Sequence, residues 1–194
     1  SSGIGGWSNA QLVEYLKTGR VTGKNQAAGG MAEAVQNSLQ YLPESDLQAI
    51  ALYLKSTTPV RDPQDTQPAD SFGKALNVEI DLRGQHPSTA NNTLDSGAAL
   101  FSGNCASCHQ PDGSGSKNQA YPSLFNNTAT GSSNPANLVS AILFGVDRKV
   151  GDEHILMPHF GPQSYVNPLN DKQIALIANY VLHSYGNPAV TVSE

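Results

Sequence analysis

The stretch Cys105-Ala-Ser-Cys108-His109 is the most specific signal in the sequence. Its two cysteines lie about one helical turn apart, so each thiol can add to one vinyl group of a haem. The histidine that follows places an imidazole where it can reach the iron. This is the spacing of covalent c-type haem attachment, and a single pair of thiols predicts one covalent haem c per chain.

Two other kinds of site also use cysteines at this spacing. A zinc centre needs four ligands, and Cys108 and His109 are adjacent with no second pair nearby. A redox dithiol is expected after a strand and at the start of a helix, whereas residues 94–104 have the pattern of a helix that leads into the motif. Both alternatives fit the sequence less well than a haem does.

A haem also needs a second axial ligand, and few residues after the motif can supply one. Met157 is the preferred candidate because it lies in a Met-Pro turn between two helical patterns. The alternatives are a methionine that only fills a gap in the core, and ligation by His154 or His159, which otherwise fit surface or propionate-side positions. His86 and His183 have the pattern of ordinary solvated histidines.

Helical patterns flank this turn on both sides. An N-cap at Asn134 with Pro135 at the first helical position opens one helix, which Gly145 closes. A second helix begins at Asn170, with Gln173 at the capping-box position. Each helix has an apolar face, which is Leu138, Val139, Ile142 and Leu143 in the first and Ile174, Ile177, Ala178 and Val181 in the second.

A third helix, over residues 94–104, is predicted to lead into the cysteine motif. Leu94, Ala98 and Phe101 share its apolar face, and Gly97 allows close contact with another helix. No strand pattern competes with these helices. The sequence therefore predicts an all-α fold, with residues 91–187 as a monohaem domain and residues 188–194 as a tail.

The landmarks of this domain recur near the N-terminus. A helix pattern, a glycine and a methionine repeat at a constant offset of 126 positions, pairing Leu12, Val13, Gly19 and Met31 with Leu138, Val139, Gly145 and Met157. Ser8 and Gln11 supply a capping box for the first of these helices. Residues 1–56 are therefore expected to be the second half of another haem domain, with no attachment motif of their own, so the chain is expected to begin inside that domain. Met31 is then either an orphaned ligand or, as we prefer, a core or loop residue.

Residues 57–90 have the composition of a linker. Four prolines, Pro59, Pro63, Pro68 and Pro87, punctuate a stretch with few apolar residues. Val78, Ile80 and Leu82 alternate as a short extended segment would. A linker of this length is either disordered or laid along a neighbouring surface, and we favour docking.

The charge distribution limits the kinds of partner. The chain has 11 basic and 16 acidic residues, which gives a formal net charge of −5 and disfavours binding to nucleic acid. Residues 62–194 hold six of the basic and twelve of the acidic side chains. A partner that docks there is therefore expected to present cations.

Through these motifs the sequence resembles class I cytochrome c. The resemblance is greater to the C-terminal part of the multihaem cytochrome c subunit of bacterial alcohol and gluconate dehydrogenases, that is, to its last haem domain and the second half of the preceding one. The residues that carry it are the cysteine motif, Tyr121-Pro-Ser-Leu124, Met157-Pro-His-Phe160, Gly5-Gly-Trp7, Leu16-Lys-Thr-Gly-Arg20 and Met31-Ala-Glu-Ala-Val35.

The resemblance implies a role for each site residue. Cys105 and Cys108 would form the thioethers, His109 would be the proximal ligand and Met157 the distal ligand. The carbonyl of Pro122 would orient the imidazole. Such subunits pass electrons in the periplasm from a quinoprotein or flavoprotein dehydrogenase, in a membrane-associated complex, towards a quinone or another redox protein.

The function that follows is outer-sphere electron transfer at one haem with His and Met ligands, which favour a comparatively high potential. Arg148 and Lys149 are candidates for pairing with the propionates, and both fit solvated loop charges equally well. The apolar residues expected near the porphyrin are Leu124, Leu138, Ile142, Phe160 and Ile177.

Two rival functions remain open at this stage. A haem enzyme or gas sensor would need an open or labile sixth position, against which Met157 argues. The haem-less first repeat offers a binding or scaffolding role instead, and its apolar helices need cover, either from the linker or from a homodimer through residues 1–56.

Overall fold

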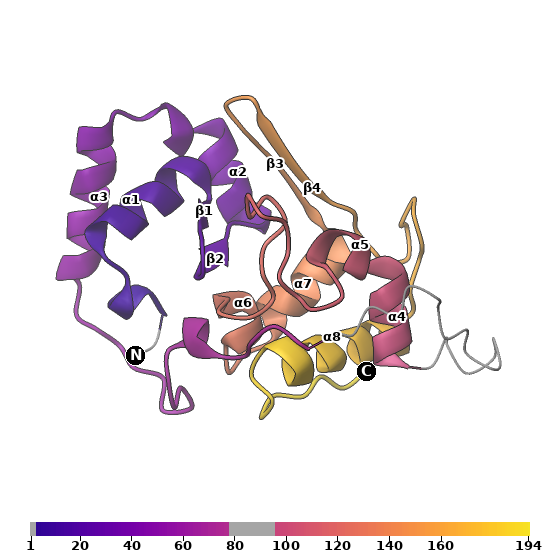
Figure 1. Ribbon diagram of the computed structural model, residues 1–194. Helices are drawn as coiled ribbons and strands as arrows, with labels where there is room; N and C mark the ends of the chain where they lie inside the picture. The colour runs from indigo at the N-terminus through magenta and orange to yellow at the C-terminus, as the bar shows by residue number, and fades with distance from the viewer. Residues whose placement is uncertain (1–2, 78–95) are drawn as a thin grey trace.

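The computed structural model describes residues 3–77 and 96–194. Two helical units lie side by side, one formed by the N-terminal residues and one by the C-terminal residues (Figure 1). A β-hairpin rises between them and lies beside helix α2 of the N-terminal unit. The candidate site lies where the two units meet.

The N-terminal unit begins and ends its first helix at the residues predicted. In α1 (Asn9–Thr18) the hydroxyl of Ser8 accepts a hydrogen bond from the Gln11 amide at 3.1 Å, and the Gln11 side chain accepts one from the Ser8 amide at 2.9 Å. Gly19 ends the helix with φ +73°, a conformation that suits glycine. The other elements are η1 (Gly3–Gly6), β1 (Arg20–Val21), β2 (Asn25–Gln26), α2 (Gly29–Asn37), η2 (Leu39–Tyr41) and α3 (Glu44–Ser56).

The C-terminal unit contains helices around the cysteine motif, but the one predicted over residues 94–104 begins at Gly97, and Leu94 lies outside the described residues. Its elements are α4 (Gly97–Asn104), α5 (Ala106–His109), α6 (Thr128–Gly131), α7 (Ala136–Phe144), the strands β3 and β4, and α8 (Asp171–Tyr185). The capping box of Asn170 and Gln173 is present at the start of α8. Helix α7 begins one residue later than predicted, because Pro135 is the N-cap while the Asn134 side chain accepts from the Ala136 amide at 2.9 Å.

The expectation that no strand competes with the helices is wrong for residues 146–157. Strands β3 (Val146–Val150) and β4 (Glu153–Met157) form an antiparallel hairpin, and Val146 pairs with Met157. Gly151 and Asp152 connect the two strands, and Gly151 has φ +56°. Gly-Asp between two stretches of alternating burial is a hairpin signal, and the hairpin occupies most of the segment in which we expected only a Met-Pro turn at Met157.

Helices α4 and α8 pack closely at Gly97. A Cβ atom on Gly97 would come within 2.3 Å of the Leu176 carbonyl oxygen, so only glycine permits this approach. The core around this contact takes in the apolar faces of α4, α7 and α8, with Leu100, Phe101, Leu138, Ile142, Ile174, Ile177, Ala178, Val181 and Leu182 buried. No helix among residues 3–77 and 96–194 is long and apolar enough to cross a membrane.

The described part of the linker lies against the C-terminal unit. A short turn, η3 (Ala69–Ser71), packs beside α6, and the Asn126 amide donates a hydrogen bond to the Phe72 carbonyl at 2.8 Å. The Leu76 amide donates to the Asp112 carbonyl at 3.1 Å. Asp70 forms an ion pair with Lys24 of the N-terminal unit. The predicted extended segment Val78, Ile80 and Leu82, together with His86, lies outside the described residues.

Candidate haem site

The cysteine motif lies at the junction of α4 and α5. The Cys105 amide donates a hydrogen bond to the Phe101 carbonyl at 2.8 Å, which ends α4, and the His109 amide donates to the Cys105 carbonyl at 3.0 Å. The two cysteines form no disulfide, and both are half-buried. Burial, with the nearby Cys108 sulfur, raises the pKa of the Cys105 thiol to about 12. Both cysteines and the histidine line one cavity.

The imidazole of His109 is held in one orientation. Its Nδ1 lies 2.9 Å from the carbonyl oxygen of Pro122, and since a carbonyl only accepts, Nδ1 carries the proton. Burial lowers the pKa of His109, and this hydrogen bond opposes the shift. The ring is therefore neutral with the Nε2 lone pair uncommitted, which is the form that coordinates a metal.

Met157 approaches the same cavity from the end of β4. Gly145, which precedes the facing strand, lies so close that a Cβ atom on it would be 2.4 Å from the Met157 carbonyl oxygen. Its φ of +70° also favours glycine. The glycine thus permits the approach of β3 to the residue that we expect to be the distal ligand.

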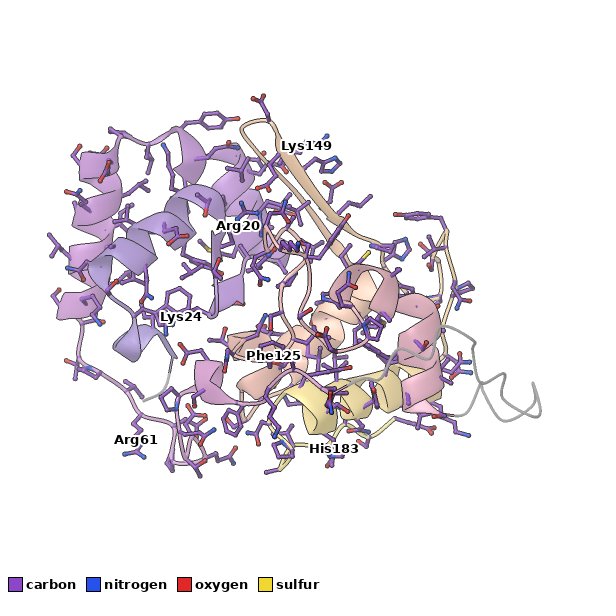
Figure 2. The ribbon with its side chains drawn as sticks, viewed as in Figure 1. Arg20, Lys24, Arg61, Phe125, Lys149 and His183 are labelled. Carbon is purple, nitrogen blue, oxygen red and sulfur yellow. The ribbon has the colours of Figure 1, made fainter. Side chains whose placement is uncertain are left out.

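The other three described histidines, His154, His159 and His183, lie outside the cavity. His154 is bonded to Asp147 across the hairpin surface, at 2.7 Å between Nε2 and Oδ1. The His159 ring packs edge-on against Tyr165, with centroids 5.5 Å apart. Neither of these histidines is among the residues that line the cavity. His183 is exposed on α8 (Figure 2).

The cavity has a volume of about 510 Å³ and mostly apolar walls. Four of the residues expected near the porphyrin line it, namely Leu124, Leu138, Ile142 and Phe160. Ile177 does not, because its side chain is only 1% exposed and is packed in the core beside α4 and α7. A wide apolar space with two thiols, an imidazole and a thioether on its walls suits a large planar ring that must be kept dry.

The N-terminal unit supplies part of the cavity wall, which sequence reasoning did not predict. Tyr15, Met31 and residues 25–30 line the same space as His109. The repeat relates Met31 to Met157, but no local pattern indicates that the two units enclose one cavity. Contacts between segments more than a hundred positions apart leave no periodic signal in a single sequence.

Of the two candidate partners of the propionates, Arg148 is buried and Lys149 is exposed. Arg148 is 1% exposed and donates from Nη1 to the Ala27 carbonyl at 2.7 Å and from Nη2 to Gln26 Oε1 at 3.2 Å. Its Nε is buried with no hydrogen-bond partner among the described residues. The cavity is lined by Gln26 and Ala27 and not by Arg148 itself. Lys149 is exposed on the hairpin (Figure 2).

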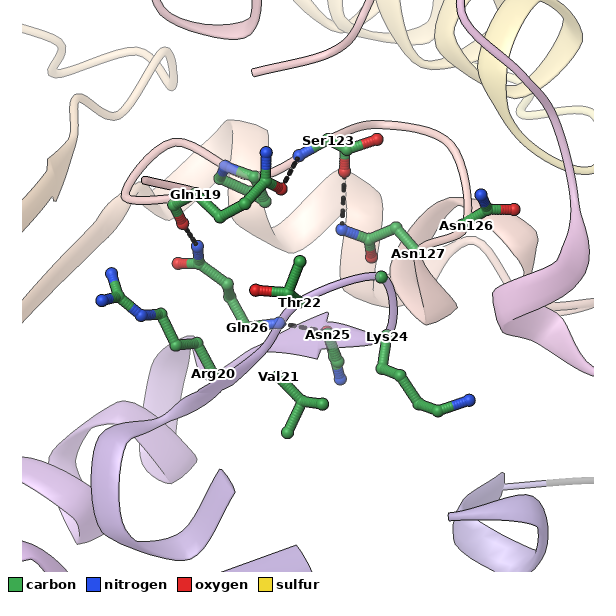
Figure 3. Close-up of a pocket in the computed structure, with 12 residues that line it drawn as sticks. Arg20, Val21, Thr22, Lys24, Asn25, Gln26, Gln119, Ser123, Asn126 and Asn127 are labelled. Atoms are coloured by element: carbon green, nitrogen blue, oxygen red, sulfur yellow. Dashed lines mark hydrogen bonds between the residues drawn. The ribbon is translucent and has the colours of Figure 1, made fainter. Parts of the chain in front are cut away.

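A polar contact between the two units supports the loop that carries Pro122. Figure 3 shows Gln26 of β2 facing this loop, and Gln26 Nε2 donates to the Gln119 carbonyl at 2.6 Å. Within the loop, the Ser123 amide donates to Gln119 Oε1 at 3.1 Å, and Asn127 Nδ2 donates to the Ser123 carbonyl at 3.0 Å. The loop that orients His109 is thus fixed at both of its sides.

The donor set fits a haem better than a lone metal ion. Among the described residues, no group of three or more His, Cys, Asp and Glu side chains could hold a metal ion. Two thiols beside a neutral imidazole, with a thioether on the same cavity, are instead the groups that attach and ligate a c-type haem. Site and helices together define the class of c-type cytochromes.

Comparisons with known proteins agree with this class. Residues 94–184 match the model of the cytochrome c family, and a match to this family implies a covalent c-type haem. The whole chain is similar to cytochrome subunits of dehydrogenases. The fructose dehydrogenase cytochrome subunit of Gluconobacter japonicus is 48% identical over 99% of the chain.

Two further relatives have related names. The cytochrome c subunit of alcohol dehydrogenase (quinone) from Gluconobacter oxydans is 31% identical over 97% of the chain, and the gluconate 2-dehydrogenase cytochrome c subunit of Pantoea cypripedii is 32% identical over 96%. The chain spans 40%, 36% and 39% of the lengths of these three relatives. The resemblance to dehydrogenase cytochrome subunits is thus confirmed for the part that the chain covers.

Proposed function

We propose that this chain is an electron carrier with one covalent haem, attached through Cys105 and Cys108 and ligated by His109 and Met157. One observation carries the proposal: both thiols, the imidazole and the methionine line the same apolar cavity. With His109 and Met157 as its ligands, a haem held here would supply a one-electron couple and would offer no open position to a substrate.

The protein's own residues set the properties of that couple. The Pro122 carbonyl accepts a hydrogen bond from Nδ1 of His109 and so fixes the orientation of the imidazole. This leaves Nε2 as the nitrogen that would coordinate the iron. The soft thioether of Met157 favours the ferrous state over the ferric state, and apolar walls that exclude water act in the same direction. We therefore expect a comparatively high reduction potential for a haem.

Arg148 is the proposed partner of a propionate. A buried guanidinium with an unpartnered Nε, held by two residues of the cavity wall, suits a nearby carboxylate. Lys149 is exposed and has no such support.

The intact mass of the denatured protein tests the proposal directly. Thioether bonds survive denaturation, so we expect the mass of the chain plus one haem, together with a low-spin visible spectrum. An unmodified mass, with free thiols or a disulfide, contradicts haem attachment. A high-spin, water-ligated ferric iron supports a haem enzyme or gas sensor in place of an electron carrier.

The names of the relatives suggest the partners. The proposed electron donor is a quinoprotein or flavoprotein dehydrogenase subunit, and the acceptor is a quinone or another redox protein. The acidic excess of residues 62–194 suits a cationic docking surface on the partner. The proposed location is the periplasm, in a membrane-associated complex.

The proposed domain organisation follows the two repeats. Residues 1–56 are the second half of a cytochrome c domain without its own haem, residues 57–90 a linker, residues 91–187 the monohaem domain and residues 188–194 a tail. Both units have a helix that ends at a positive-φ glycine, a short hairpin and a later helix, which supports a shared origin. A homodimer through the exposed apolar side chains of Tyr41, Leu52 and Tyr53 is a further proposal.

A further inference from the structure

Two glutamines of the N-terminal unit hold the backbone of strand β3. The Lys149 amide donates to Gln36 Oε1 at 2.7 Å, and the Gly151 amide donates to Gln40 Oε1 at 2.9 Å. Gln40 Nε2 also donates to the Lys149 carbonyl at 3.1 Å. Gln36 lies on α2 and Gln40 on η2, so two elements of the N-terminal unit bind the end of β3 and the turn that follows it.

Further contacts between the N-terminal unit and the hairpin involve Arg148 and Arg20. Arg148, the residue beside Lys149, is inserted into the N-terminal unit, where a Cβ atom on Gly19 would come within 2.9 Å of its side chain. Arg20 forms a half-exposed ion pair with Glu153 of β4 at 2.9 Å, a kind of contact that contributes little on its own. The glutamines and Arg148 are therefore the contacts that fix β3.

The position of β3 determines the position of Met157. Val146 at the start of β3 pairs with Met157 at the end of β4, and Arg148 pairs with Ile155. Gly145 is in close contact with the Met157 carbonyl, so β3 cannot shift without moving that residue. A metal ligand holds its position against competing ligands only as firmly as its support allows.

We propose that Gln36 and Gln40 are positioning residues for Met157, through which the N-terminal unit determines how firmly the thioether occupies the distal position. This inference rests on the proposed role of Met157 as distal ligand. It gives the N-terminal unit a function towards the proposed haem of the other unit. The two glutamines touch neither Met157 nor the cavity, and they act only through β3.

The test compares the Gln36→Ala/Gln40→Ala double variant with the unchanged chain. With these three hydrogen bonds lost, the ferric protein should bind added imidazole about tenfold more tightly, a change of about 1.4 kcal/mol. Its reduction potential should also fall. Both quantities are measured on the full holoprotein, by spectroscopic titration and by potentiometry.

Two single variants serve as controls. Gln36→Glu keeps an oxygen that accepts from the Lys149 amide, so it should keep the imidazole affinity of the unchanged chain. Gln48→Ala removes an exposed glutamine of α3 whose side chain bonds to Glu44 of the same helix, and it should change neither quantity.

The outcomes separate this inference from the function on which it rests. A double variant that loses stability but keeps its imidazole affinity and potential overturns the positioning role, because the glutamines then only help the units to pack. The ligand assignment is judged independently, with Met157→Ala. If that variant has the spectrum of the unchanged chain, the distal assignment fails and the inference fails with it.

Discussion

Met157 is the residue whose loss should have the clearest effect. In Met157→Ala, we expect the haem to stay attached while the sixth position opens to water, cyanide or carbon monoxide. The potential should fall by on the order of 0.1 V, within the roughly 0.8 V span that axial ligands control. Visible spectroscopy and potentiometry measure both changes.

The matched controls are the two nearby histidines. His154 is bonded to Asp147 and His159 packs on Tyr165, so His154→Ala and His159→Ala should leave spectrum and potential unchanged. A low-spin spectrum and an unaltered potential in Met157→Ala, with disturbance in a histidine variant, would show that the distal ligand is a histidine.

At this scale the sequence predicted which residues form the candidate site but not which residues enclose it. The spacing of Cys105, Cys108 and His109 indicates haem attachment because the chemistry requires neighbouring residues. The setting of Arg148 was not predicted, since its partners Ala27 and Gln26 lie 121 and 122 positions away. Such contacts depend on tertiary packing, which a single sequence encodes only indirectly.

Among the helices, the contact of α4 with α8 at Gly97 should be the most sensitive to added volume. In Gly97→Ala the new methyl group would lie 2.3 Å from the Leu176 carbonyl oxygen, so the helices must separate. We expect a loss of about 2 kcal/mol in the free energy of unfolding, measured by denaturant titration of the holoprotein.

Gly103, on the same helix, is the control for this substitution. A Cβ atom at Gly103 meets nothing within 4 Å, so Gly103→Ala should raise the free energy of unfolding by about 0.5–1 kcal/mol through helix propensity. Equal effects of the two substitutions would contradict a steric origin at Gly97.

The helices were predictable wherever local chemistry determines their ends. The capping boxes at Ser8 and Asn170 and the glycine ends at Gly19 and Gly145 are all present. The β3–β4 hairpin was missed, in spite of the hairpin signal at Gly151-Asp152, because the charged Arg148 interrupts the apolar face of Val146 and Val150. The N-terminal unit buries that arginine, and the pattern of the strand itself does not show this contact.

On the scale of the whole molecule, the uncovered apolar surface of the N-terminal unit is small. Leu12, Leu16 and Leu47 are buried, whereas Tyr41, Leu52 and Tyr53 are 74%, 58% and 70% exposed. If these three form a dimer interface, sedimentation should show concentration-dependent association. Leu52→Glu should abolish it, because association would bury an unpaired carboxylate.

Val60→Glu is the control for association. Val60 is 86% exposed and follows α3, outside the proposed surface, so this variant should associate as the unchanged chain does. A chain that stays monomeric at all concentrations would contradict the homodimer and leave the electron-carrier proposal unaffected.

The shared cavity also bears on the order in which this protein matures. Its walls join residues as far apart as Tyr15 and Phe160, and closing a loop of that length carries an entropic cost that delays such contacts in folding. The turn from Cys105 to His109 needs only local hydrogen bonds. We therefore expect the thiols to adopt their helical geometry while the facing wall is still open. Covalent attachment of the proposed haem is expected in that interval, before the N-terminal unit docks and encloses it.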